Sequence, residues 1–272
     1  MKKIDIETKT LLKKELDANI LRLTLNDPER RNALSLEMIK QISDAINNAS
    51  LDKKIKVIII AATAPAFCAG HDLKEMTAAR KQADHGHAFY TELFSNCSAL
   101  MQLIVNCPKP VIAEVSGVAT AAGCQLVASC DLAIASVQSK FATPGVNIGL
   151  FCSTPMVALS RNVANKHAME MLLTGEMIDA KKAKEIGLVN HVVDEPDLSA
   201  RTSKLATLIA SKSPITVSLG KKTFYLQLDQ PLDKAYELCS EVMTHNMLKG
   251  EAKEGISAFL DKRLPNWGIK DE

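Results

Sequence analysis

The start of the chain alternates apolar and polar positions, which is the period of a half-buried β-strand. Residues 20–25 show this alternation, and the turn formers Asp17, Ala18 and Asn19 separate them from a second strand-like run at 11–16. Two such runs joined by a short turn predict a β-hairpin.

Beyond the hairpin the apolar period becomes that of a helix. Behind Ser35, which is placed as an N-cap, apolar residues recur every three or four positions at Leu36, Ile39, Ile42 and Ile46. A second helical pattern covers 89–104. Continuous apolar runs, which are typical of strands buried on both faces, lie at 56–62, 110–115 and 132–136. Strands that alternate with helices predict an α/β fold.

From Pro155 onward the pattern is mainly helical, with one short strand-like run at 188–193. No Ser- or Gly-rich linker separates the two parts of the chain. We therefore expect one continuous unit, with an α/β core over residues 1–195 and a helical C-terminal region over residues 196–272.

Charge and composition exclude several classes of partner. Lys and Arg total 33 against 31 for Asp and Glu, so a formal net charge of +2 gives no general attraction to nucleic acid or to an anionic membrane. No apolar run approaches the roughly 18 residues of a membrane span. The N-terminal stretch 1–14 contains Asp5 and Glu7 and does not resemble a secretory or transit peptide. We expect a cytoplasmic protein with no nucleic-acid or membrane partner.

Several kinds of chemistry lack a motif in this sequence. The seven cysteines form no C-x-x-C pair, which favours buried free thiols, and the six histidines have no metal-ligand spacing, so we expect no metal site. There is no G-x-G-x-x-G, Walker A or G-x-S-x-G motif. The lysine pairs at 181–182 and 221–222 are interpreted as solvated helix faces.

Two segments, 67–76 and 116–125, share one design, in which an apolar strand runs through small residues into a helix. A helix start presents unpaired N–H groups, and small residues let a ligand approach them. Two such N–H groups aimed at one point would form an oxyanion hole. Tight strand-to-helix turns that serve packing alone would give the same pattern, and the residues by themselves leave both readings open.

Ordered motifs over nearly the whole chain resemble the crotonase superfamily, that is, the enoyl-CoA hydratase/isomerase family. They are N-D-P at 26–28, R-N-A-L at 31–34, F-C-A-G-H-D-L-K-E-M at 67–76, K-P-V-I-A at 109–113, A-G-C at 122–124, C-D-L at 130–132, L-T-G at 173–175 and E-G-I-S-A-F at 254–259. The resemblance implies a crotonase-like spiral of ββα turns with a C-terminal helical trimerisation region. It also implies a homotrimer or homohexamer that binds an acyl-CoA thioester.

The resemblance also implies roles for individual residues. The backbone N–H groups of His71 and Ala122 would hold the thioester oxygen. Contacts to coenzyme A, which enters as part of the substrate with no separate cofactor, would come from Arg31, Ala69, His71, Asp72, Leu73, Lys74, Gly123, Phe259 and Lys262. Phe259 and Lys262 match positions that reach the coenzyme A of a neighbouring site.

The sequence departs from this family at its acid and base. Family hydratases use two glutamates to add water to the double bond, and here those positions hold Gln125 and Gly145. A glutamine can hydrogen-bond a water but cannot take its proton, and a glycine offers no side chain. The aspartate of the dienoyl isomerases is replaced by Ser153. Neither Glu114 nor Asp72 is established by the sequence as a substitute.

Three uses of such a site stay open. The first is an altered hydratase or isomerase in fatty acid metabolism, with Gln125 positioning a water. The second is decarboxylation of a malonyl-type thioester, in which Thr143, Asn147 and His71 would bound the carboxylate pocket. The third is a protein that binds acyl-CoA without turnover.

Overall fold

The computed structural model describes residues 10–267, and the N-terminal expectation for residues 1–9 lies outside this range. A six-stranded sheet forms its centre, in the order β1-β2-β3-β5-β7-β10. Only the pair β1 and β2 is antiparallel in this sheet. The strands are β1 (Leu12–Asp17), β2 (Ile20–Leu25), β3 (Val57–Ala62), β5 (Val111–Val115), β7 (Leu132–Ser136) and β10 (His191–Val193).

A second sheet of four short strands runs in the order β4-β6-β8-β9. Its members are β4 (Ala66–Cys68), β6 (Val118–Thr120), β8 (Lys140–Ala142) and β9 (Ile178–Asp179). The strands β3, β5 and β7 of the large sheet are each followed directly by one of these short strands, so that each turn of the chain adds a strand to both sheets. The hydrophobic pattern does not predict the second sheet, because two or three residues are too few to show a period.

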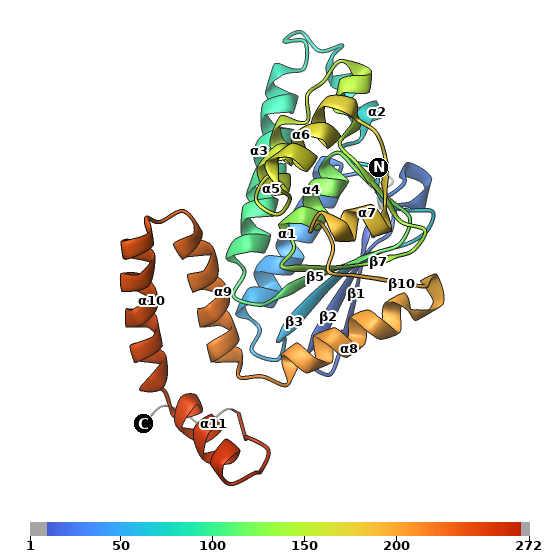
Figure 1. The fold of residues 1–272 in the computed structure, drawn as a ribbon. Helices are drawn as coiled ribbons and strands as arrows, with labels where there is room; N and C mark the ends of the chain where they lie inside the picture. Colours follow the sequence, from blue (N-terminus) through green and yellow to red (C-terminus); the bar gives the residue numbers. More distant parts are fainter. Residues whose placement is uncertain (1–9, 268–272) are drawn as a thin grey trace, which may run out of the picture.

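Helices cover both faces of the large sheet (Figure 1). One face carries α1 (Leu36–Leu51), α3 (His87–Asn106) and α4 (Ala122–Ser129), and the other carries α8 (Leu198–Ala210). Val57 and Ile59 of β3 pack with Ala206 of α8, whereas Ile58 and Ile60 belong to the main core. Burial on both faces explains the continuous apolar run that predicts this strand.

The remaining core helices are short. They are α2 (Leu73–Ala79), α5 (Ser153–Leu159), α6 (Asn165–Thr174) and α7 (Ala180–Glu185), with 3-10 turns η1 (Pro28–Arg30), η2 (Pro144–Ile148) and η3 (Glu195–Asp197). The predicted cap of α1 is confirmed, since Ser35 Oγ accepts a hydrogen bond from the Met38 N–H at 3.1 Å. No helix within residues 10–267 is long and apolar enough to cross a membrane.

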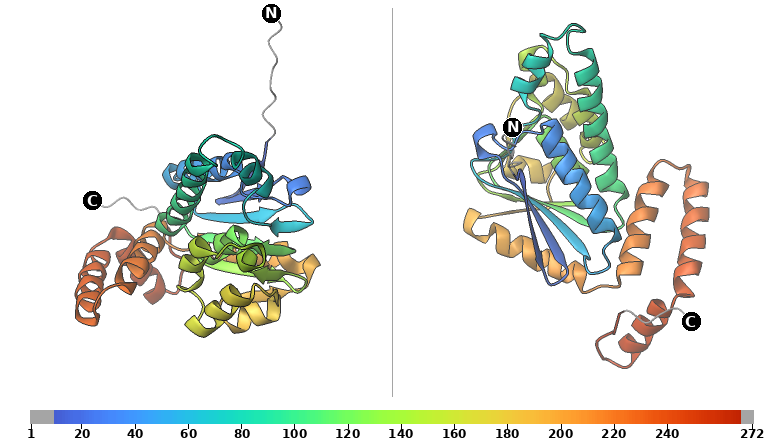
Figure 2. Two further views of the ribbon diagram at one scale, coloured as in Figure 1. Left: turned by 90° about the horizontal axis from the view of Figure 1, so that it is seen from above. Right: turned by 180° about the vertical axis from the view of Figure 1, so that it is seen from behind.

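The last three helices project from the core as an arm, seen from two sides in Figure 2. They are α9 (Pro214–Leu228), α10 (Leu232–Met247) and α11 (Gly250–Leu260). The arm leaves large apolar side chains in solvent, including Phe224 (57% exposed) and Tyr236 (69%). Exposed apolar surface of this extent favours contact with other subunits. The trimer or hexamer stays a prediction, as does the division of the chain near residue 195.

Lys221 corrects the interpretation of the paired lysines as solvated. Its side chain is only 7% exposed, and its Nζ lies 2.7 Å from Asp131 Oδ2. The same ammonium donates to the Ile104 and Lys109 carbonyls, while the Tyr225 hydroxyl donates to Asp131 Oδ1 at 2.9 Å. This network joins the base of the arm to the core. Charge patterning failed here because it does not reveal which face of α9 meets another element.

Candidate functional site

The two small-residue segments meet at one edge of the second sheet. β4 and β6 are parallel neighbours, so the chain leaves both strands at the same edge. The first segment passes through Gly70 and His71 into α2, and the second passes through Ala121 into α4. A hydrogen bond from Thr120 Oγ1 to the Ala69 carbonyl, at 3.1 Å, joins them.

Glycine lets the two backbones come close. A Cβ on Gly70, which has φ +92°, would lie only 3.4 Å from the Ala122 nitrogen and 3.1 Å from the Thr120 carbonyl oxygen. A Cβ on Gly123 would lie 2.8 Å from the carbonyl carbon of Cys68, and closer still to its oxygen. The sequence therefore holds glycine where another side chain would push the segments apart.

Both backbone donors of the predicted oxyanion hole are free. Within residues 10–267 neither the His71 N–H nor the Ala122 N–H donates a hydrogen bond to a protein acceptor. Ala122 is the first residue of α4, where the N–H groups lack intrahelical partners and the dipole is positive. Ala121 before it has φ 50° and ψ −119°, a conformation that is strained for a residue with a Cβ.

The His71 side chain lies against the backbone of Leu34. Its Nδ1 is 3.2 Å from the Leu34 carbonyl oxygen, and its ring contacts that of Phe94 edge-on at 5.5 Å. A carbonyl oxygen can only accept, so Nδ1 carries the proton and Nε2 presents a lone pair. Nε2 is buried and has no partner in the described structure. Burial lowers the pKa of His71, and the hydrogen bond to Leu34 opposes this shift only in part. Because the pKa lies below its usual value, the ring is neutral at neutral pH.

Two further buried polar atoms without a partner belong to residues of the predicted site. They are Gln125 Oε1, on α4, and Thr143 Oγ1, just before η2. A buried polar atom that bonds nothing in the protein is costly, and such atoms point to an absent water or ligand. In the decarboxylase interpretation, Thr143 and the His71 side chain would bound a carboxylate pocket. Their contacts in the structure do not establish such a pocket.

The structure explains why Gly145 is a glycine. This residue is buried in η2, and a Cβ on it would lie 2.6 Å from the Leu150 carbonyl oxygen and 2.9 Å from Cys152 Sγ. The backbone of the next turn therefore occupies the space in which a glutamate side chain would begin.

The carboxylates considered as substitutes are engaged in structural contacts. Glu114 forms a bidentate pair with Arg22, at 2.6 and 2.9 Å. Asp72 caps α2 and accepts from Arg30 Nη1 at 3.1 Å. Glu75, which sequence reasoning missed, has a buried Oε2 without a partner in the described chain. Burial raises its pKa, and the Leu36 N–H lowers it. A glutamate in the first turn of a helix, four residues after His71, was the signal available in the sequence.

The residues expected to bind coenzyme A fall into two groups. The Arg31 carbonyl accepts from the Ala69 N–H at 3.1 Å, which brings the exposed Arg31 beside the first segment. Leu73 and Lys74 are exposed in the first turn of α2. Phe259 (83% exposed) lies at the end of α11 and Lys262 just beyond it, at the opposite end of the molecule from α2 (Figure 1).

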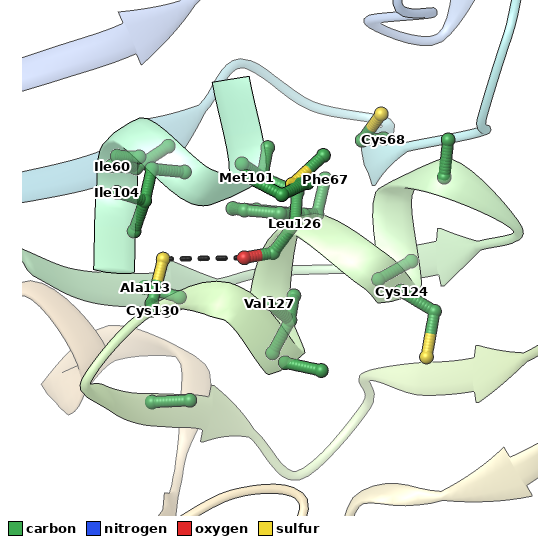
Figure 3. Packing of buried hydrophobic residues seen from close by; sticks show 14 of the residues in the cluster. Ile60, Phe67, Cys68, Met101, Ile104, Ala113, Cys124, Leu126, Val127 and Cys130 are labelled. Carbon is green, nitrogen blue, oxygen red and sulfur yellow. Dashed lines mark hydrogen bonds between the residues drawn. The ribbon is translucent and has the colours of Figure 1, made fainter. Parts of the chain in front are cut away.

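The cysteines around α4 are part of the core (Figure 3). Figure 3 shows Leu126 of α4 next to Phe67 and Met101, with Cys68 and Cys124 nearby. Burial raises the pKa of both thiols to about 12, so they are protonated and not nucleophilic at neutral pH. A groove of about 830 Å³, lined in part by Lys56, Lys109 and Trp267, lies between the core and α9, and no residue of the two segments lines it.

Comparison with known proteins identifies the family. The model of the family described as "Enoyl-CoA hydratase/isomerase" matches residues 15–270. The mitochondrial enoyl-CoA hydratase domain-containing protein 3 of Rattus norvegicus is 52% identical over 248 residues, which cover 91% of this chain and 81% of the relative. The protein of the same name from Danio rerio is 45% identical over 270 residues, which cover 99% of this chain and 92% of the relative.

Solved structures agree with these relatives. The crystal structure of the human enoyl-CoA hydratase domain-containing protein 3 superposes with a TM-score of 0.90 at 49% identity, covering 94% of this chain and all of that one. An enoyl-CoA hydratase from Mycobacterium smegmatis superposes with a TM-score of 0.90 at 45% identity, and the match covers 94% of this chain and 98% of that one. The predicted α/β crotonase fold with a helical C-terminal region is confirmed.

The prediction of a cytoplasmic location is wrong by this comparison, because the rat, mouse, frog, human and zebrafish relatives are named as mitochondrial proteins. The prediction depended on the charge of the first residues, most of which lie outside the described range. A stretch that fails to resemble a leader gives no positive signal for any compartment, and this is why the inference failed.

Proposed function

The chain belongs to the enoyl-CoA hydratase/isomerase family, and from that premise we propose that it binds acyl-CoA thioesters and polarises their carbonyl group. The observations that support the proposal are that neither the His71 N–H nor the Ala122 N–H donates to an acceptor within residues 10–267, and that Gly70, which precedes His71, lies close to the Ala122 nitrogen. The thioester oxygen accepts from both.

These donors favour a negative charge on the thioester oxygen more than a neutral carbonyl. Fixed dipoles in a buried site stabilise an enolate without reorganising, because folding has already oriented them. The N-terminus of α4 adds its partial positive charge. The site therefore acidifies the α-carbon of a bound thioester, which is the shared requirement of isomerisation and related reactions at that carbon.

Coenzyme A extends from the first segment toward solvent. We place Ala69, Asp72 and Leu73 along its pantetheine arm, and the cations Arg31 and Lys74 beside its phosphates. Phe259 and Lys262 reach the site of a neighbouring subunit in a trimer or hexamer, because α11 lies away from its own two segments. The compounds that fit this site are the acyl and enoyl thioesters of fatty acid metabolism.

Efficient hydration is not part of the proposal. Adding water to an enoyl thioester needs a base to deprotonate the water and an acid to protonate the α-carbon. Gln125 cannot exchange a proton in these roles, and Gly145 has no side chain. Losing one positioned acid or base typically costs about 10²–10⁴-fold in rate. Gln125 instead holds a water or a polar group of the ligand through its free Oε1.

The experiment is a product analysis of a short trans-2-enoyl-CoA incubated with the purified chain. Binding is measured in the same sample by titration calorimetry. We expect saturable binding without the gain of a water at an enzymatic rate. A thioester that does not bind contradicts the proposed site, and a water adduct formed at an enzymatic rate contradicts the assignment of Gln125 and Gly145.

A further inference from the structure

We propose that the side chain of His71 is the base that moves the α-proton of the bound thioester, which rests on the thioester site proposed above. The backbone N–H of this residue is assigned to the thioester oxygen. Its imidazole is part of the same residue, and its buried Nε2, which has no partner in the described chain, is the atom that the proposal places against the α-carbon next to that carbonyl. One residue would thus stabilise the enolate and take the proton whose loss creates it.

The hydrogen bond to Leu34 fixes the form of the ring. Nδ1 donates to the Leu34 carbonyl at 3.2 Å, so the free nitrogen, Nε2, is the basic one. Nε2 is buried and has no partner within residues 10–267. We therefore expect an atom of the ligand to contact Nε2 when the site is filled. The packing of the ring against Phe94 holds it in place.

The other polar groups of the site do not offer this chemistry. The side chains of Gln125 and Thr143 do not accept a proton near neutral pH, and Glu114 and Asp72 are bound to arginines. Glu75 is the one competing acid with a buried free oxygen in the described chain. A lone pair at Nε2 also disfavours a carboxylate in the acyl pocket, which argues against the malonyl-type decarboxylase.

One base is enough for isomerisation of a 3-enoyl thioester. Nε2 takes a proton from C2, the C2–H bond breaks, and its electrons spread over C2 to C4 and the thioester oxygen, which the two N–H groups hold. The resulting imidazolium returns the proton to C4, where a C4–H bond forms. The double bond moves from C3–C4 to C2–C3, the imidazole is regenerated, and no other reactant is consumed.

The test uses trans-3-hexenoyl-CoA and follows the ultraviolet absorbance of the conjugated product. His71→Asn keeps an N–H for the Leu34 carbonyl and keeps the backbone donor, but removes Nε2. We expect its rate to fall about 10²–10⁴-fold with the dissociation constant for the thioester nearly unchanged. His191→Asn is the matched control, because His191 lies on β10 and takes no part in the site.

Two further variants separate a base from a structural role. In His71→Ala, added imidazole should restore part of the lost rate, which a purely structural side chain would not permit. Glu75→Gln should keep most of the activity. Normal isomerisation by His71→Asn, or a loss of activity confined to Glu75→Gln, would overturn the inference.

The wild-type chain separates this inference from the proposed function. If it binds the thioester but neither isomerises it nor exchanges its α-protons with D₂O, the base assignment is wrong and the binding site stands. If it does not bind the thioester, the proposed function fails first, and the base assignment fails with it.

Discussion

Gly123→Ala is the substitution that tests the contact between the two segments most sharply. The new Cβ would lie 2.8 Å from both the carbonyl carbon and the Cβ of Cys68, and closer still to the carbonyl oxygen. Carbon atoms that are not bonded to each other prefer about 3.5–4.0 Å. The start of α4 must therefore retreat from β4 by about 1 Å, and Ala122 must move with it.

Two losses follow from this displacement. Overpacking in a close-packed interior costs about 1–3 kcal/mol of folding free energy. A displacement of about 1 Å in a binding or catalytic group can cost about 10²-fold in rate. We expect Gly123→Ala to unfold at lower urea concentration. We also expect it to lose more affinity for an acyl-CoA thioester than for free coenzyme A, because only the thioester uses the Ala122 N–H.

Gly220→Ala is the matched control. Gly220 lies inside α9, and a Cβ there meets nothing within 4 Å. Alanine in a helix interior is favoured over glycine by about 1 kcal/mol, so this variant should be as stable as the wild type or more stable. Urea unfolding measures the stability of both variants, and titration calorimetry measures their affinity for the thioester. A Gly123→Ala protein with wild-type stability and thioester affinity would refute the close contact at the site.

Three further predictions concern other parts of the chain. Lys221→Met should lower the free energy of unfolding, measured in urea, by about 3–5 kcal/mol because it leaves Asp131 without its cation. Lys222→Met, on the exposed face, should change it little. Equal effects of the two substitutions would contradict the buried network. The double variant Gln125→Glu, Gly145→Glu should lose stability and gain no hydration, because Leu150 and Cys152 fill the space at Gly145; a water adduct in the product mass would refute this. The pKa of His71 is near 6.5 in the unfolded chain and lower in the folded protein, where burial disfavours the charged ring. Wild-type stability should therefore fall as the pH drops below 6.5. His71→Asn should lack this component in a pH series of thermal unfolding.

Much of the large sheet and its helices could be predicted from the sequence. The strand bounds of β2 and β7 agree with the predicted runs, and the Ser35 cap fixes the start of α1. These elements bury whole faces, and so leave a clear period. The short strands of the second sheet leave none, although they place the site. Lys221 shows the same limit for charge, since its partner lies 90 positions away in the sequence.

The candidate site could be predicted in part. The small residues of 67–76 and 116–125 indicated two backbone turns, but their approach across Gly70 and Gly123 depends on the pairing of β4 with β6. The absence of a side chain at position 145 was evident, whereas its cause, the packing of Leu150 and Cys152, was not. The basic form of His71 depends on Leu34, 37 positions away, and no local pattern reveals it.

The most direct test of the central claim is the infrared spectrum of an acyl-CoA bound to the chain, with ¹³C at the thioester carbonyl. If the His71 and Ala122 N–H groups hold the oxygen, the carbonyl band shifts to lower wavenumber on binding, and the shift shrinks in Gly123→Ala. A fully bound thioester whose carbonyl band stays at its position in water would contradict the oxyanion hole and the function built on it.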